Sequence, residues 1–260
     1  MKKVLNPKLF FSMTYDFLTV YIPQDSPSSR TVKTYRDGLT VFRRYVTEIK
    51  HLSLRTFTFD QCTFDFLLEY RNWLLDDKKR AASTVNNRIA AIKSYMYYAA
   101  ARDASLQQIQ LNVSSVPFLK VEKKIRPIIE NTETLKDFLN APPNTRTGCR
   151  DVMILSVLFC TMIRADELIK LDVKDVEMNS DVPYLRVHGK GGKERMAPLS
   201  ERVVPLINAY LEEYHETSRD RNSPFIYTIQ HGVKNRMSER NIERIVKKYA
   251  DQVRCRHPDL

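Results

Sequence analysis

The stretch HGKGGKERMAPL, residues 188–199, contains three of the six glycines in this 260-residue chain. Sequence typical of β-strands lies on either side of these glycines, PYLRV before them and RMAPL after them. Glycine supplies the positive φ angles that a tight hairpin needs, and it removes side-chain bulk where the backbone approaches another molecule. We therefore expect two β-strands joined by a glycine-rich turn that carries basic side chains.

A nucleotide-binding P-loop is the first alternative for these glycines. That motif has the spacing G-x-x-x-x-G-K-[ST]. Neither Gly189-Lys190 nor Gly192-Lys193 has a glycine five residues upstream, and neither lysine is followed by serine or threonine. The spacing therefore excludes a P-loop.

The chain is globular in composition and strongly basic. It is 43% hydrophobic and 28% charged, and its length suffices for two modest domains. Its 42 Lys and Arg residues against 31 Asp and Glu give a net charge of +11. This excess favours a polyanionic partner, because phosphates that are neutralised by protein cations release their counterions. Nucleic acid is the leading partner class, and a basic scaffold that binds no DNA is the alternative.

The cysteines indicate a reducing compartment. All four are scattered and form no CxxC pair, and the histidines do not lie at zinc-ligand spacing from them. No secretory apolar segment follows the first residues, and no apolar run approaches the ~20 residues that span a bilayer. We expect a cytoplasmic protein with free thiols, no metal or other cofactor, and no membrane partner.

The first hundred residues predict a helical bundle. Apolar residues recur at helical spacing in one predicted helix, at Tyr35, Leu39, Phe42, Val46 and Ile49. Its opposite face is basic and carries the candidate DNA contacts Lys33, Arg36 and Arg43. A second helix is expected over residues 62–77, with Phe66, Tyr70 and Trp73 in the core.

A third helix is expected from Ser83-Thr84 onward. Its buried stripe is Val85, Ile89, Ile92 and Met96, which places Asn86, Asn87, Arg88 and Lys93 on the solvent side. Short polar and basic side chains on an exposed helix face suit phosphates and base edges in a major groove. For any one of these residues a merely solvated position is the alternative; as a set they favour DNA contact.

The second half predicts a mixed α/β domain, so the expected fold is mainly α with a small β-hairpin or sheet. Residues 1–106 form the helical domain in this interpretation, 107–127 an extended basic linker, and 128–260 the second domain. In the latter a short helix is expected over 132–140, and a long apolar helix breaks near Thr161 before another begins near Ala165. The hairpin and two further helices follow, the last of them amphipathic.

Three motifs of this half resemble the tyrosine recombinases, also called phage-type integrases. TMIRADEL, residues 161–168, resembles the family's T-G-L-R-x-x-E-L, and LDVKDV, residues 171–176, resembles L-x-x-x-D-I. Residues 187–199 are similar to the hairpin V-x-G-K-G-x-K-x-R-x-V-P-L. The predicted N-terminal bundle resembles the family's core-binding domain. The resemblance therefore covers nearly the whole chain.

The resemblance implies a DNA-binding protein of site-specific recombination and integration. Enzymes of this family break and rejoin DNA through a phosphotyrosine intermediate, without a metal. By resemblance Arg164 is the first catalytic arginine, Glu167 supports it, and Lys190 protonates the leaving 5′-oxygen. A guanidinium suits this role because it can fork two N–H groups onto one phosphate. Two further hairpin cations, Lys193 and Arg195, are candidate DNA contacts.

This sequence departs from the family pattern in two places. Met162 stands where the family usually has glycine, so we expect a differently built turn before Arg164. The family's His-x-x-Arg block and nucleophilic tyrosine would follow the final helix, and the sequence stops at Leu260 before them.

The second departure leads to the expectation of a chain that binds duplex DNA but does not complete cleavage. It would then be either a truncated recombinase or a natural short DNA-binding module that occupies recombination sites. Other recombinase protomers are expected as partners only when the C-terminal segment is present.

Overall fold

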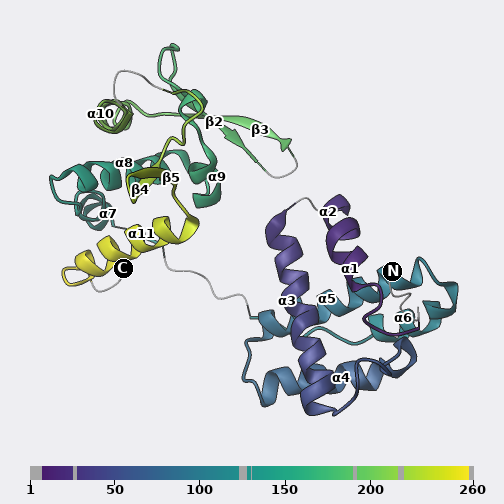
Figure 1. Ribbon diagram of the computed structural model, residues 1–260. Helices are drawn as coiled ribbons and strands as arrows, with labels where there is room; N and C mark the ends of the chain where they lie inside the picture. Colours follow the sequence, from purple (N-terminus) through teal and green to yellow (C-terminus); the bar gives the residue numbers. More distant parts are fainter. Residues whose placement is uncertain are drawn as a thin grey trace. The chain divides into compact units, whose positions relative to one another are not determined.

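The structure, a computed structural model, describes residues 8–25, 28–122, 128–129, 131–189, 192–215 and 220–257. The chain divides into two compact units, residues 1–124 (unit 1) and 125–260 (unit 2). Each has its own hydrophobic core. Figure 1 shows the helices and strands of both units. Among the described residues no helix is long and apolar enough to cross a membrane.

Unit 1 is built of helices. Two of them continue as π-helical turns, α1 into Phe17–Tyr21 and α3 into Tyr45–Ile49, and short 3₁₀ turns occupy Phe59–Gln61 and Ala104–Leu106. The α-helices are α1 Thr14–Asp16, α2 Ile22–Asp25, α3 Ser29–Arg44, α4 Phe64–Asp76, α5 Ala82–Ala100 and α6 Gln107–Ser114.

Aromatic rings fill the core of unit 1. Phe10 lies at the centre, with its ring centroid 5.1–5.4 Å from those of Phe42, Phe57, Phe59 and Tyr95. Such spacings are favourable for tilted aromatic pairs. The buried stripe predicted for α5 is confirmed, since Val85, Ile89, Ile92 and Met96 are all fully buried.

The predicted α3 face is confirmed at Leu39, Phe42 and Val46, but Ile49 is exposed at the end of the π-helical turn. A π-turn winds more slowly than an α-helix, so the 3.6-residue period no longer sets the facing of its last residue. Helices α3 and α5 pack against each other (Figure 1). They approach closely at Gly38, where an added Cβ would lie 2.7 Å from the Cβ of Ala91.

The expected linker is partly folded. Its first residues form α6, and Val113 and Val116 are buried in the core of unit 1. The missing periodicity of this segment has a physical cause: α6 is short, and the residues after it are held to α5 by hydrogen bonds to side chains. The expectation of an extended linker is therefore wrong for residues 107–114.

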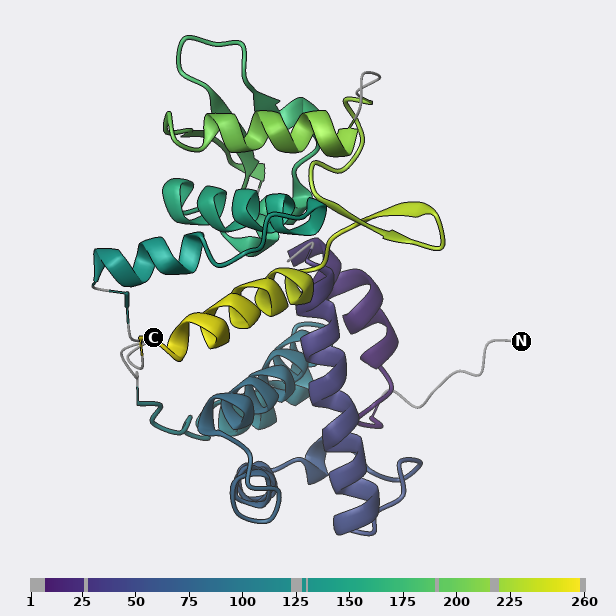
Figure 2. The same cartoon turned by 90° about the vertical axis from the view of Figure 1, so that its left-hand side faces the viewer.

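Unit 2 combines helices with two small antiparallel sheets, which confirms the predicted fold class. One sheet has the order β1-β2-β3 and the other is the hairpin β4-β5, which projects from the unit in Figure 2. The strands are β1 Val176–Glu177, β2 Tyr184–His188, β3 Glu194–Pro198, β4 Tyr227–Gln230 and β5 Val233–Arg236. The helices are α7 Thr132–Leu139, α8 Arg146–Thr161, α9 Ala165–Lys170, α10 Val204–His215 and α11 Glu239–Arg254.

Helix ends in unit 2 follow local capping chemistry. The side chains of Asn131, Thr145 and Ser238 accept backbone N–H groups at the starts of α7, α8 and α11. Helix α8 ends at Met162, which has φ 53° and ψ 23°. This is the left-handed conformation that glycine usually supplies at a helix end. Met162 thus takes a backbone conformation suited to glycine, and the expectation of a differently built turn stays a prediction.

Met162→Gly is expected to raise the free energy of unfolding by about 0.5–1 kcal/mol. A left-handed conformation costs an L-residue about 1–2 kcal/mol, and glycine avoids this cost. Part of the gain in stability is lost, because glycine makes the unfolded chain more flexible. The side chain is 75% exposed, so little burial is lost. Urea unfolding measures the change.

Met162→Ala is the matched control, because it removes the same side chain but keeps the Cβ. The account of Met162 is wrong if the glycine variant is no more stable than the alanine variant.

Candidate active site

Arg164 stands at the start of α9 in unit 2. The left-handed Met162 turns the chain out of α8, and Arg164 is the N-cap of the next helix with φ −73° and ψ 153°. Its side chain is 81% exposed. The turn thus presents a guanidinium to solvent at the junction of two helices.

Glu167 receives donors from two directions. Its Oε2 accepts the backbone N–H of Arg164 at 2.8 Å, and its Oε1 accepts Nη1 of the same residue at 3.2 Å. Arg195 on β3 binds both oxygens, with Nη1 3.0 Å from Oε1 and Nη2 2.8 Å from Oε2. One carboxylate therefore joins the start of α9 to the hairpin.

The carboxylate of Glu167 is both buried and ionised. Glu167 is only 5% exposed. The hydrogen bonds from Arg195, aided by those from Arg164, lower the pKa of Glu167 to about 2 in spite of burial, which acts the other way. The structure brings the predicted pair of Arg164 and Glu167 together. Arg195 was expected to contact DNA, and in the structure both of its Nη atoms donate to Glu167.

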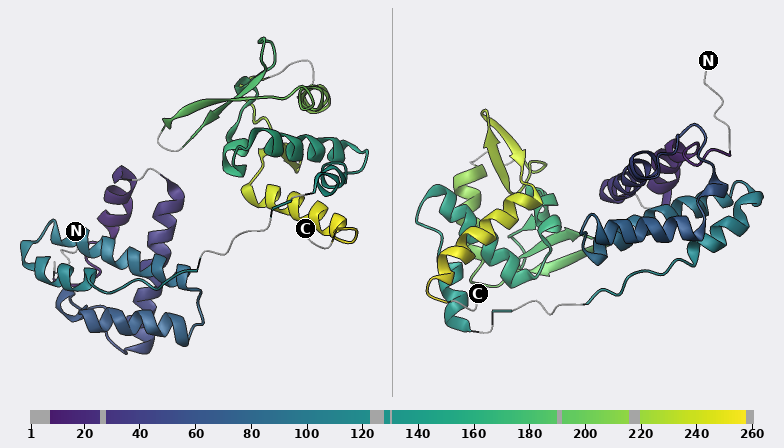
Figure 3. Two further views of the ribbon diagram at one scale, coloured as in Figure 1. Left: turned by 180° about the vertical axis from the view of Figure 1, so that it is seen from behind. Right: turned by 90° about the horizontal axis from the view of Figure 1, so that it is seen from below.

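The predicted hairpin is present (Figure 3). His188 and Glu194 face each other as its last register pair, and the N–H of Gly189 donates to the carbonyl of Lys193 at 2.7 Å. Gly192 has φ 74°, a conformation that glycine adopts readily and other residues rarely adopt, which explains the glycine at this position of the turn. Lys193 is exposed. Lys190 lies outside the described residues.

The candidate contacts of unit 1 fall into two groups. The first group is exposed on α3 and α5: Lys33, Arg36, Arg43 and Asn87. Of these, Arg43 has its guanidinium carbon over the ring of Phe11, 5.2 Å from the centroid, which is a cation–π contact.

The second group is turned toward the protein. Lys93 donates to the carbonyls of Ser114 at 2.8 Å and Val116 at 2.5 Å. Burial lowers the pKa of this lysine. Asn86 exchanges two hydrogen bonds with the backbone of Leu119, at 2.8 and 2.9 Å.

Arg88 belongs to the same group, because its Nε and Nη1 are buried beside Tyr70 without a hydrogen-bond partner among the described residues. The prediction of a solvent-facing position is wrong for Asn86, Arg88 and Lys93. Residues 114–119 fold back over α5, and their carbonyl groups need donors.

Sequence reasoning missed the cations of α11. The helix was expected to be amphipathic, but its outer face was not assigned a role. Arg240, Arg244, Lys247 and Lys248 recur at steps of four, three and one residue and are all exposed. Three of them, with Arg150 and Asp151, line a groove of about 600 Å³ between α8, β4 and α11. This charge spacing was visible in the sequence.

The tyrosines of unit 2's core are engaged in the fold. The hydroxyl of Tyr249 donates to Asp151 at 2.9 Å, that of Tyr214 to the carbonyl of Arg146 at 2.7 Å, and that of Tyr210 to the carbonyl of Phe225 at 3.0 Å. Burial raises the pKa of each of these three phenols. None of the three is suited to act as a nucleophile in this arrangement.

Curated relatives match most of this chain. Tyrosine recombinase XerC of Natranaerobius thermophilus is 29% identical over 249 residues, which span 93% of this chain and 78% of that protein. Tyrosine recombinase XerC of Staphylococcus epidermidis is 32% identical over 72% of this chain, and tyrosine recombinase XerD of Staphylococcus aureus is 30% identical over 71%. Each of these two matches spans 59% of the relative's length.

Solved structures share the fold at lower identity. A lambda integrase tetramer bound to a Holliday junction gives a TM-score of 0.66 at 14% identity, covering 92% of this chain and 62% of that one. The XerH site-specific recombinase bound to its palindromic difH substrate gives 0.65 at 17% identity, covering 85% and 62%.

Family models match both halves of the sequence. The model of the phage integrase family matches residues 130–258, and the model of the phage integrase N-terminal SAM-like domain matches residues 15–103. The first range contains the Arg164–Glu167–Arg195 cluster and the second the helical bundle of unit 1. The chain belongs to the phage integrase family of tyrosine recombinases.

Proposed function

We propose that this protein acts in site-specific DNA recombination, binds duplex DNA with both units, and holds Arg164 against a backbone phosphate. The observation that carries the proposal is the state of Arg164, a permanently charged side chain that is exposed yet tied to a buried carboxylate. A guanidinium held in this way is oriented before the phosphate arrives, so less ordering is needed on binding.

The chemistry of this site is phosphate recognition. Glu167 accepts a hydrogen bond from one Nη of Arg164, and no other side-chain bond of this guanidinium is seen among the described residues. Its remaining N–H groups can then fork onto two non-bridging oxygens. Positive charge there stabilises the extra negative charge of a pentacoordinate phosphorus. Lys190 is proposed as the proton donor to the leaving oxygen, on the family resemblance.

The proposed DNA surface follows the exposed cations. In unit 1 it comprises Lys33, Arg36, Arg43 and Asn87; in unit 2 it comprises Lys193 and the outer face of α11. Arg195, Asn86 and Lys93 serve it indirectly, because they hold the backbone or the carboxylate beneath the surface.

A finer proposal is that residues 1–260 bind DNA without cutting it. Its support is the engagement of Tyr210, Tyr214 and Tyr249 in buried hydrogen bonds. In this form the chain occupies a recombination site as a DNA-binding module. Recombinase protomers are the proposed partners on DNA, and the cytoplasm is the proposed location, which the four free cysteines favour.

Duplex binding is expected to weaken linearly on a log–log plot of affinity against salt. Each neutralised phosphate contributes a slope of about 0.9, and Arg36→Ala should lower the slope by about 1 because it removes one contact. Fluorescence anisotropy with a labelled duplex measures both. Lys170→Ala is the control, since Lys170 is already paired with Asp166 at 2.5 Å. Affinity that does not respond to salt would contradict DNA binding by this surface.

A nicked suicide substrate is expected to give no covalent adduct with residues 1–260. The buried phenols of unit 2 cannot reach a phosphate without unfolding their surroundings. Denaturing electrophoresis and mass spectrometry detect an adduct if one forms. An adduct that disappears in Arg164→Ala would show that this chain cuts DNA at the proposed site.

Glu167→Gln is expected to lower the free energy of unfolding by about 1–3 kcal/mol, because the amide cannot accept all the donors that meet there. The pKa of Glu167 is lowered from 4.5 to about 2, so its contribution is complete above pH 4.5 and is lost as the pH falls through 2. The stability difference between wild type and variant should therefore shrink only below pH 4.5.

Chemical unfolding between pH 2.5 and 7 measures this difference, and Glu177→Gln, a change on the short β1, is the control. An unchanging difference across the whole range would contradict the role of the Glu167 charge.

A further inference from the structure

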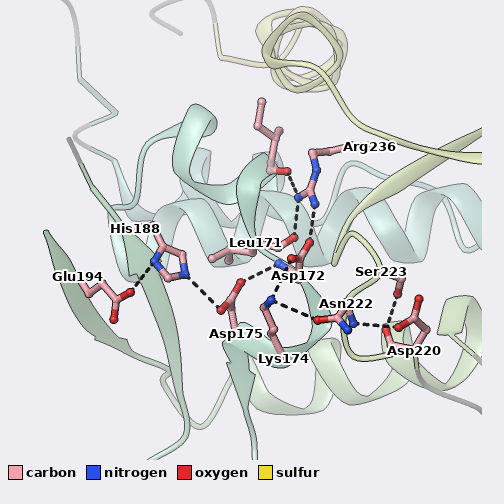
Figure 4. Close-up of polar contacts among 11 residues, drawn as sticks. Leu171, Asp172, Lys174, Asp175, His188, Glu194, Asp220, Asn222, Ser223 and Arg236 are labelled. Atoms are coloured by element: carbon pink, nitrogen blue, oxygen red, sulfur yellow. Dashed lines mark hydrogen bonds and ion pairs between the residues drawn. The ribbon is translucent and has the colours of Figure 1, made fainter. Parts of the chain in front are cut away.

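His188, the last residue of β2, lies between two carboxylates (Figure 4). Its Nε2 is 3.3 Å from Oδ1 of Asp175, and its Nδ1 is 3.0 Å from Oε1 of Glu194. Carboxylate oxygens only accept hydrogen bonds when ionised, so each ring nitrogen needs a proton to donate to its partner. The site therefore suits the imidazolium form of the ring.

Asp175 anchors this arrangement to the body of unit 2. It is 3% exposed, and its second oxygen accepts the backbone N–H of Asp172 at 2.9 Å. Asp172 in turn accepts a hydrogen bond from Nη2 of Arg236 (Figure 4). Nη1 of the same arginine donates to the carbonyls of Ile169 and Leu171 at the end of α9. Through Asp175 the ring of His188 is thus connected to the helix that begins at Arg164.

The start of β3 is consequently held on both faces. Glu194 and Arg195 are consecutive residues, and consecutive strand residues point to opposite faces of a sheet. Glu194 meets His188 on one face, and Arg195 meets Glu167 on the other. A loss of either contact frees the strand end that carries the other.

We propose that His188 is a positioning residue, whose protonated ring clasps Asp175 and Glu194 and keeps β3 where Arg195 meets the Glu167 that holds Arg164. As far as it concerns DNA the inference rests on the proposed function. The clasp itself is a property of the protein alone.

Acidic and basic groups surround His188. Asp175 faces it from the turn before β1 and Glu194 from β3. Among the described residues, Arg186 on β2 is a nearby cation, with Tyr184 beside it. Histidine is the side chain that ordinarily changes charge between pH 5 and 8. A neutral imidazole carries one N–H and an imidazolium carries two, so only the protonated ring can donate to both carboxylates.

Melting temperatures of wild type, His188→Gln, Arg195→Gln and the double variant test the clasp at pH 6.0 and 8.0. At pH 6.0 we expect His188→Gln to lower the melting temperature by about 1–3 °C. The double variant should lose less than the sum of the single losses, because both changes release the same strand end. At pH 8.0 the losses should add. Arg195→Lys replaces Arg195→Gln if the latter does not fold.

DNA affinity supplies a readout that a merely structural histidine would not move. Between pH 8.0 and 6.0 the affinity of wild type should rise by about twofold to fivefold more than that of His188→Gln. His231→Asn is the control, since His231 lies exposed in the β4–β5 turn with φ 50°. That variant should follow wild type.

The outcomes separate the two proposals. Additive losses at both pH values, or identical pH profiles of affinity in wild type and His188→Gln, overturn the clasp. A wild-type protein that binds no DNA defeats the proposed function, and the melting temperatures then decide on the clasp alone.

Discussion

The carboxylate of Glu167 is the contact on which the site of unit 2 depends. It is buried and ionised, and a buried charge is tolerated only where donors surround it. Two of its donors come from Arg164 and two from Arg195, so the requirement of one acid sets both the backbone turn before α9 and the position of β3. The guanidinium of Arg164 is the exposed part of this network and is available to an external anion. It is well oriented although exposed, because it is hydrogen-bonded to the buried Glu167.

The need of buried acceptors for hydrogen-bond donors also shapes unit 1. Backbone carbonyls that fold against α5 need donors, and Lys93 and Asn86 supply them. Part of a basic helix face is therefore not available to DNA. Side chains that donate to the protein's own carbonyl groups have to be distinguished from cations that face solvent. In α3 the two kinds do not mix: Lys33 and Arg36 remain exposed, and the apolar residues alone make the core.

Much of the fold follows from local pattern. Helical periodicity predicted the buried stripe of α5 and the break of α8 near Thr161, and the glycines between two strand-like segments predicted the hairpin. Each of these features depends on neighbours a few residues away. The same pattern could not show that residues 107–114 are helical or that Lys93 points inward, since both depend on packing against a distant helix. Motif spacing predicted that Arg164 and Glu167 belong together. It could not show that Arg195, 28 residues further along, completes the carboxylate's shell, because only the folded hairpin brings it there.

Sharing one carboxylate between two arginines has a mechanical consequence for the proposed function. Arg195 lies two residues from Lys193, so a force on the hairpin turn acts on the strand end that reaches Glu167. Glu167 passes any displacement to the backbone N–H of Arg164, because that bond fixes the first turn of α9. DNA contact at the hairpin and phosphate contact at Arg164 are then linked through a single acid, and the hairpin strands must be held firmly for the arginine to stay in place. The left-handed conformation of Met162 supports this coupling. A residue in that conformation between two helices leaves the backbone little freedom to absorb a shift.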